Sequence, residues 1–346
     1  MTNEARVPTR MGDGTFVHLT RSEIRADLVA GSEAAFKRAK VPPLTDEQLD
    51  HLLDIYASPA RFTGVDVGDE IILSCDGTGM KTHSMRIQDL QSYEQWMGAD
   101  LLELCVGDYS LKVVRTILAY EAQYMHDALL ATVAPLQYGV MPNLGLYSKP
   151  DGPCDNWNEL LPLGKIAEAK AAQEEALEMA VLDMVHLADS QYEAGADAID
   201  WDTTGASGDP EFLAALRATA IIREKHPDLG IQMGMAGEFV LGMHGELEYE
   251  GVRLAGLWPR EQMKLAAKAG VTIFGPAINV NTGKSVAWNV ARTLTIAKPC
   301  CDAATVPVHL NGGMGVGGVP MHILPPGDAT SRASRAAVDI LHLDGL

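Results

Sequence analysis

The sequence predicts an α/β protein built on a TIM-type (β/α)8 barrel, and a repeated local pattern is the main evidence. Three times a helical pattern ends at a glycine and a short apolar run follows, starting at Gly98, Gly195 and Gly270. Glycine is preferred just past a helix end because it enters the left-handed region without a Cβ clash. A short, continuous apolar run is typical of a parallel strand buried on both faces. Six or seven such strand–helix units favour a barrel over a doubly wound sheet.

The other strands and helices follow from apolar runs and helical periodicity. Strands are expected at 101–106, 132–138, 198–202, 230–235, 273–276 and 306–311. Helices are expected over 111–130, 165–194 and 259–269. The last of these begins at Pro259, which is tolerated in the first helical turn. This alternation predicts a parallel sheet with crossover helices.

The two ends of the chain differ from the repeating part. Residues 1–70 are interpreted as a helical appendage to a barrel domain spanning 71–346, with Thr20 and Thr45 as helix-capping residues. The final residues predict a helix that runs into a new strand at Leu346. A closed barrel cannot be completed from what is present, so we expect it to be incomplete at its C-terminal end.

Composition excludes several functional classes. The net charge of −19 disfavours nucleic acid as a partner, because an acidic surface repels phosphate. No apolar run reaches the length of a membrane span, and the polar start is not a signal peptide. The five scattered cysteines are typical of reduced intracellular thiols. We therefore expect a cytoplasmic protein without membrane or nucleic-acid partners. A homo-oligomer is also expected, although composition does not determine the oligomeric state.

Carboxylates at predicted strand ends are the candidate catalytic residues. Asp200 and Asp202 alternate at the end of one strand, so both can point to the same face. Neighbouring carboxylates suit acid–base chemistry or the binding of an ammonium group. Glu238 follows the next strand in a glycine-rich turn. Each of these residues could instead cap a helix or face solvent.

Polar loops after the later strands provide candidates for cofactor contact. His309 lies near the end of a strand, and the glycine-rich loop that follows allows close backbone approach. A histidine in such a place could equally be a packed core residue. The candidates are Asn279, Asn281, His309, Asn311, Gly313 and Gly315.

Three motif-like patterns fail on inspection. Gly313, Gly315 and Gly318 match G-x-G-x-x-G, but Pro320 follows where a dinucleotide site needs a helix. The loop ending in Gly-Lys-Ser has Ile278 where a P-loop needs glycine. The H-x-E that starts at His244 has no P-C-x-x-C partner, so no metal site is predicted.

Several longer strings together resemble the dimethylamine methyltransferase family of methylamine metabolism. They occur in order across nearly the whole chain, which is more specific than one shared motif. The strings are RMGDGTFVHLT (10–20), MPNLGLYSKPDGP (141–153), DTTGASGD (202–209), GMAGEFVLGMHGELEYEGVRLAGLWP (234–259), FGPAINVNTGKSVAWNVART (274–293) and GGMGVGGVPMHILPPGDATSRASRA (312–336).

The resemblance implies a barrel enzyme that transfers a methyl group from dimethylamine to the Co(I) of a separate corrinoid protein, giving monomethylamine. It further implies a pyrrolysine, encoded by UAG, directly after a stretch similar to AVDILHLDGL, which ends here at Leu346. No tightly bound cofactor is expected on this chain. The corrinoid is expected to be carried by the partner protein. One hypothesis is that the sequence is the product read with UAG as a stop, which would be inactive; a pyrrolysine-free paralogue is the alternative. The codons that follow Leu346 in the gene distinguish the two.

Other classes of protein remain as alternatives. The enzyme could act on another methylated amine. A barrel lyase or decarboxylase acting on a small acid would need cationic anchors at the strand ends, and few are found beyond Lys284. A corrinoid-binding subunit would be expected to carry D-x-H-x-x-G, which is absent from the sequence.

Overall fold

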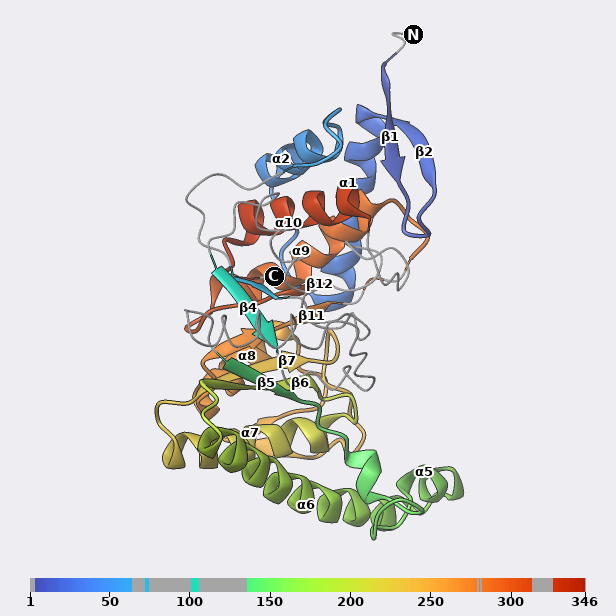
Figure 1. The fold of residues 1–346 in the computed structure, drawn as a ribbon. Helices are drawn as coiled ribbons and strands as arrows, with labels where there is room; N and C mark the ends of the chain where they lie inside the picture. The colour runs from blue at the N-terminus through green and yellow to red at the C-terminus, as the bar shows by residue number, and fades with distance from the viewer. Residues whose placement is uncertain are drawn as a thin grey trace, which may run out of the picture.

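A parallel β-sheet forms the centre of the protein in the computed structural model (Figure 1). The structure describes residues 4–63, 72–74, 101–105, 136–278, 280, 282–312 and 326–345. Six strands lie side by side in chain order. They are β3 (Ile72–Ser74), β4 (Leu101–Cys105), β5 (Leu136–Val140), β6 (Ala198–Thr204), β7 (Gly230–Met235) and β10 (Ile273–Gly275). Every described pairing between neighbours in this sheet is parallel.

Two further segments extend the sheet beyond β10. Phe274 forms a parallel bridge with Val308, and His309 forms a parallel bridge with Gly345. With the six strands, these segments make a row of eight parallel segments in chain order. The predicted new strand near the C-terminus therefore pairs with the sheet. Pairing between the two ends of the row is not seen among the described residues.

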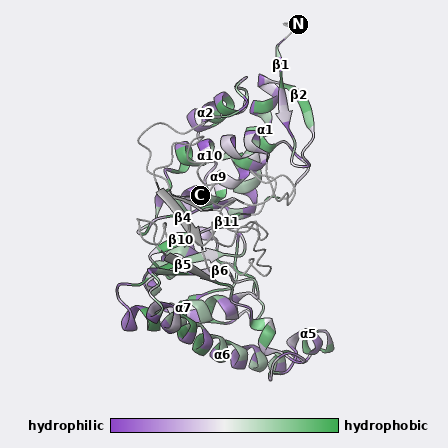
Figure 2. Cartoon of the chain, in the orientation of Figure 1, coloured by the Kyte–Doolittle hydropathy of each residue, from purple (hydrophilic) through white to green (hydrophobic). Residues whose placement is uncertain are grey.

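Helices follow the strands as crossover connections, as the alternating pattern predicted. They are α6 (Ile166–Glu193), α7 (Asp209–Lys225), α8 (Pro259–Ala269), α9 (Val286–Asp302) and α10 (Gly327–Leu341). The predictions of a helix over 259–269 and a strand over 230–235 are confirmed to the residue. The predicted helix over 111–130 and the repeat at Gly98 lie outside the described residues. Figure 2 shows hydrophilic and hydrophobic residues mixed along α6 and α7.

The N-terminal part contains a hairpin as well as the predicted helices. Strands β1 (Arg6–Arg10) and β2 (Phe16–Thr20) pair antiparallel, and α1 (Arg21–Ala39) and α2 (Asp46–Tyr56) follow. Thr20 and Thr45 cap these helices through capping boxes, which confirms both predicted helix starts. The hairpin was not predicted, because each strand has only five residues and β1 contains a proline, which disfavours a strand.

Short elements complete the described fold. They are η1 (Leu144–Tyr147), α5 (Trp157–Leu160), η2 (Leu161–Leu163), β8 (Glu248–Tyr249), β9 (Val252–Arg253), β11 (Ala277–Ile278) and β12 (Asn311–Gly312). The pairing of β11 with β12 continues the sheet beyond β10, because Ala277 lies opposite Asn311 in a parallel register.

Two apolar clusters hold these layers together. One joins the sheet to α6, α7 and α8 and includes Trp201, Phe212 and Phe274, all fully buried. The other joins α1, α2, α9 and α10. Figure 1 shows α6 and α7 on one side of the strands and α1, α9 and α10 on the other. The N-terminal residues thus pack directly on α9 and α10, and whether they form a separate unit stays a prediction. No helix among the described residues is long and apolar enough to cross a membrane.

Candidate functional site

The two faces of β6 have different roles. Trp201 is fully buried, and its Nε1 donates a hydrogen bond to Thr219 Oγ1 on α7 at 3.0 Å. Since side chains alternate along a strand, Asp200 and Asp202 point to the opposite face. Both carboxylates converge there on Gly234 of β7. A Cβ built on Gly234 would lie 3.5 Å from Asp202 Oδ1 and 3.9 Å from Asp200 Oδ1. The shared face predicted from the sequence is confirmed.

A β-bulge ends β6 next to these carboxylates. Thr203 has a φ of 57°, and the pairing with β7 shifts between Trp201 and Thr204. A β-branched residue in the left-handed region costs on the order of 1–3 kcal/mol, so the surrounding structure must hold it there. Bulges redirect side chains at strand ends. The half-buried Asp202 lies at this irregularity and accepts a hydrogen bond from Thr203 Oγ1 at 3.2 Å.

A buried carboxylate fixes the loop that follows the bulge. Glu211, in the first turn of α7, accepts hydrogen bonds from Gly205 N at 2.9 Å and from Leu144 N at 3.3 Å. Desolvation raises the pKa of Glu211, and hydrogen bonds from Ser207 and these backbone groups act in the opposite direction. Glu211 therefore ties the segment after β5 to the segment after β6. Glu211 was not predicted as a site residue, because its partners become adjacent only in the folded chain.

Further polar residues line the same face of the sheet. Gln232 lies opposite Asp200 in the parallel register and is 5% exposed. His309 follows Val308, the partner of Phe274, so its side chain lies on the face of Gly275 rather than of Phe274. Gln232 Oε1 and His309 Nε2 are buried without a hydrogen-bond partner among the described residues. Gln232 was not predicted, because its strand is buried on both faces and shows no polar alternation.

The structure describes one of the remaining predicted cofactor residues, Asn311. Asn311 is exposed at the end of the same row of positions, opposite Ala277. Asn279, Asn281, Gly313 and Gly315 lie outside the described residues.

Glu238 follows β7 at the same edge of the sheet, as predicted, since the ends of β6 and β7 are joined by a hydrogen bond from Ala236 N to Thr204 O. Its carboxylate, however, forms a two-point ion pair with Arg292 of α9 at 2.5 and 2.9 Å. Arg38 of α1 approaches it at 3.4 Å. These contacts give Glu238 a structural partner, and its proposed proton handling stays a prediction.

We expect Arg292→Leu to lower the free energy of unfolding by about 3–5 kcal/mol, because it leaves the carboxylate of Glu238 buried without its main partner. The two side chains are only 11% and 9% exposed. Urea unfolding of the purified protein measures the effect. Arg38→Ala is the matched control: its side chain is 53% exposed, so its loss should cost about 0–1 kcal/mol. Equal losses in the two variants would contradict this account.

Other chemistry is limited in the described part of the chain. No group of three or more His, Cys, Asp or Glu side chains could hold a metal ion there. Burial raises the pKa of the Cys300 thiol, and it raises that of Cys301 to about 12. Both thiols are therefore protonated at neutral pH and are poor nucleophiles.

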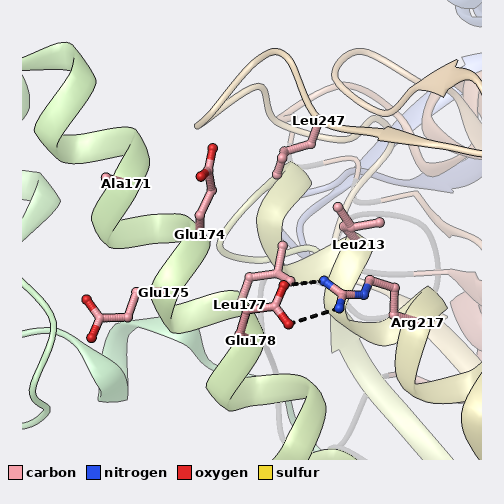
Figure 3. A pocket seen from close by; sticks show the side chains of 8 residues that line it. All are labelled: Ala171, Glu174, Glu175, Leu177, Glu178, Leu213, Arg217 and Leu247. Atoms are coloured by element: carbon pink, nitrogen blue, oxygen red, sulfur yellow. Dashed lines mark hydrogen bonds and ion pairs between the residues drawn. The ribbon is translucent and has the colours of Figure 1, made fainter.

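A surface cavity of about 460 Å³ lies between α6 and α7, on the helical layer rather than at the strand ends. Its lining combines three glutamates and one arginine with four apolar residues. Figure 3 shows Glu178 and Arg217 facing each other, with hydrogen bonds of 2.5 and 2.9 Å. The hydrogen bonds from Arg217 lower the pKa of Glu178. Glu174 is bound to His244 at 2.7 Å. These side chains are engaged with each other, and we place the candidate site at the strand ends.

Parallel strands that carry carboxylates at their carboxyl ends, with helices on both sides, define an α/β protein with a candidate site at the strand ends. The chain belongs to the dimethylamine methyltransferase family, whose sequence profile matches residues 5–346. The resemblance seen in the sequence is thus confirmed, and the protein is a methyltransferase. The homocysteine methyltransferase MmuM from Escherichia coli, in its metallated form, matches 85% of each chain at 16% identity and a TM-score of 0.29. That similarity is too low to support an inference.

Proposed function

We propose that the protein transfers one methyl group from dimethylamine to the Co(I) of a corrinoid carried by a partner protein and releases monomethylamine. The convergence of Asp200 and Asp202 on Gly234 is the observation that carries this proposal. Dimethylamine is a cation at neutral pH, and carboxylates in a partly desolvated site bind a cation far better than exposed ones do. Membership of the dimethylamine methyltransferase family indicates that the substrate is a methylated amine. We also propose that the row of parallel segments is the wall of a TIM-type (β/α)8 barrel.

The reaction requires that the leaving nitrogen become neutral. When Co(I) attacks the methyl carbon, the electron pair of the C–N bond stays on nitrogen, and a nitrogen that starts positively charged leaves as the neutral amine. Asp200 and Asp202 would hold the ammonium group so that one methyl faces the open end of the strands. Orientation of this kind converts an encounter of two diffusing partners into an aligned attack. His309 and Asn311 would shape the wall on the side of the later strands.

The resemblance also implies a pyrrolysine after Leu346, whose electrophilic imine would bind the amine. The parallel bridge between His309 and Gly345 supports a place for it, since a residue continuing that strand would follow toward the edge where Asp202 lies. Asn279, Asn281, Gly313 and Gly315 remain candidates for contact with the corrinoid. A cytoplasmic location and a homo-oligomeric state stay predictions.

Methyl transfer to a Co(I) corrinoid protein, followed by corrinoid absorbance, tests the proposal. We expect turnover with dimethylamine and much slower turnover with monomethylamine or trimethylamine. Protein made with and without UAG readthrough shows whether a pyrrolysine is needed. A preference for a different methylated amine, or no transfer by readthrough protein, would refute the proposed function.

A further inference from the structure

Neither backbone conformation nor packing against the described residues explains the glycine at position 234. Gly234 is not among the glycines with positive φ. An added Cβ would meet no described atom closer than 3.5 Å, which is ordinary van der Waals contact. Glycine inside a strand nevertheless destabilises it by roughly 0.5–1 kcal/mol relative to alanine. A glycine in a strand often marks a place where a ligand approaches closely.

The neighbouring glycine on β10 gives a contrast. A Cβ on Gly275 would lie 3.2 Å from Gly234 Cα and 3.2 Å from His309 O. These are backbone atoms that cannot easily move away, so close strand packing accounts for Gly275. At Gly234 the added carbon would instead be in ordinary contact with the two aspartates, 3.5 Å from Asp202 Oδ1 and 3.9 Å from Asp200 Oδ1.

Independent evidence indicates that this space receives a polar ligand. Gln232 precedes Gly234 by two residues on the same face, and its buried Oε1 has no hydrogen-bond partner among the described residues. The same holds for Nε2 of His309, which is 9% exposed. Buried polar atoms are rarely left unpaired, and those that are require an explanation. A ligand with N–H groups would supply what Gln232 lacks.

We propose that Gly234 is a specificity-determining residue, and that the space left by its missing side chain holds the methyl group of dimethylamine that is not transferred. The carboxylates of Asp200 and Asp202 bind the ammonium nitrogen beside it, and Gln232 Oε1 accepts one of its hydrogen bonds. The ligand class is a small secondary alkylammonium ion. This inference rests on the proposed function and adds the residue that selects the amine.

Gly234→Ala tests the proposal, because its methyl group would occupy the space of the substrate methyl. Overfilling a packed site costs on the order of 1–3 kcal/mol, so we expect binding of dimethylammonium to weaken by about tenfold or more. Binding of methylammonium, which has no second methyl, should change by less than about threefold. Calorimetric titration of the purified protein with each ion measures both without any methyl transfer.

Gly237→Ala is the matched control: it makes the same change three residues later, where Phe239 O, at 4.0 Å, is the only described atom that an added Cβ would meet. It should leave both affinities unchanged. If Gly234→Ala weakens both ions equally, or neither, the inference is wrong. If Gly234→Ala does not fold, the wild-type protein still tests the inference. Its affinity for the ion must fall steeply when one methyl group of dimethylammonium is replaced by propyl. Wild-type protein that transfers methyl groups normally but fails these binding tests would separate this inference from the proposed function.

Discussion

Asp202→Asn should lower kcat/KM for dimethylamine by about a hundredfold or more, with a marked rise in KM. Removing one partner of a desolvated charge pair typically costs about 3–5 kcal/mol, and each 1.4 kcal/mol is a factor of ten. Asn has nearly the shape of Asp and keeps an acceptor for the hydrogen bond from Thr203 Oγ1. The change therefore removes the charge while preserving the bulge. Steady-state methyl transfer to the corrinoid partner measures it.

Asp302→Asn controls for the change in net charge. Asp302 is an exposed partner of Lys298 at the C-terminal end of α9, away from the carboxylate pair. Its substitution should leave kcat/KM within about twofold, because exposed ion pairs contribute little. Asp200→Asn should resemble Asp202→Asn, and the double variant should lose less than the product of the two single effects, since both carboxylates act on one nitrogen. Near-normal kinetics in Asp202→Asn would remove this residue from the amine site.

Local sequence patterns predicted the elements whose causes are local. The start of α8 at Pro259 and the caps at Thr20 and Thr45 depend on residues within one turn. The shared face of Asp200 and Asp202 follows from strand alternation alone. Each of these predictions was correct, because the contacts that decide it lie within a few residues along the chain.

The missed features depend on residues far apart in the sequence. Arg10 of the hairpin binds Asp328 through two hydrogen bonds of 2.8 Å across 318 positions. Glu238 was placed correctly at a strand end, but its partner Arg292 lies 54 positions away. Gly234 could have been noticed as a glycine inside a strand. Its meaning required the positions of the two aspartates on the neighbouring strand.

Trp201 lies between the two aspartates on β6, and its side chain packs on the opposite face of the sheet. Its loss should therefore change both the stability of the fold and the geometry of the site. We expect Trp201→Ala to lower the free energy of unfolding by about 3–5 kcal/mol. The side chain is fully buried, and its loss leaves a cavity and the buried hydroxyl of Thr219 without its partner. Urea unfolding measures the loss, and dimethylammonium affinity reports the effect on the site.

Conservative variants separate the hydrogen bond of Trp201 from its volume. Trp201→Phe keeps most of the packing but leaves the Thr219 hydroxyl unpaired, and Thr219→Val leaves the indole N–H unpaired, so each should cost about 1–3 kcal/mol. The double variant removes both polar groups and should cost less than the sum of the two single variants. Additive losses would show that the 3.0 Å hydrogen bond contributes little. If Trp201→Phe were as unstable as Trp201→Ala, packing of the aromatic ring would not be what stabilises β6. The proposed support of the two aspartates from α7 would then be wrong.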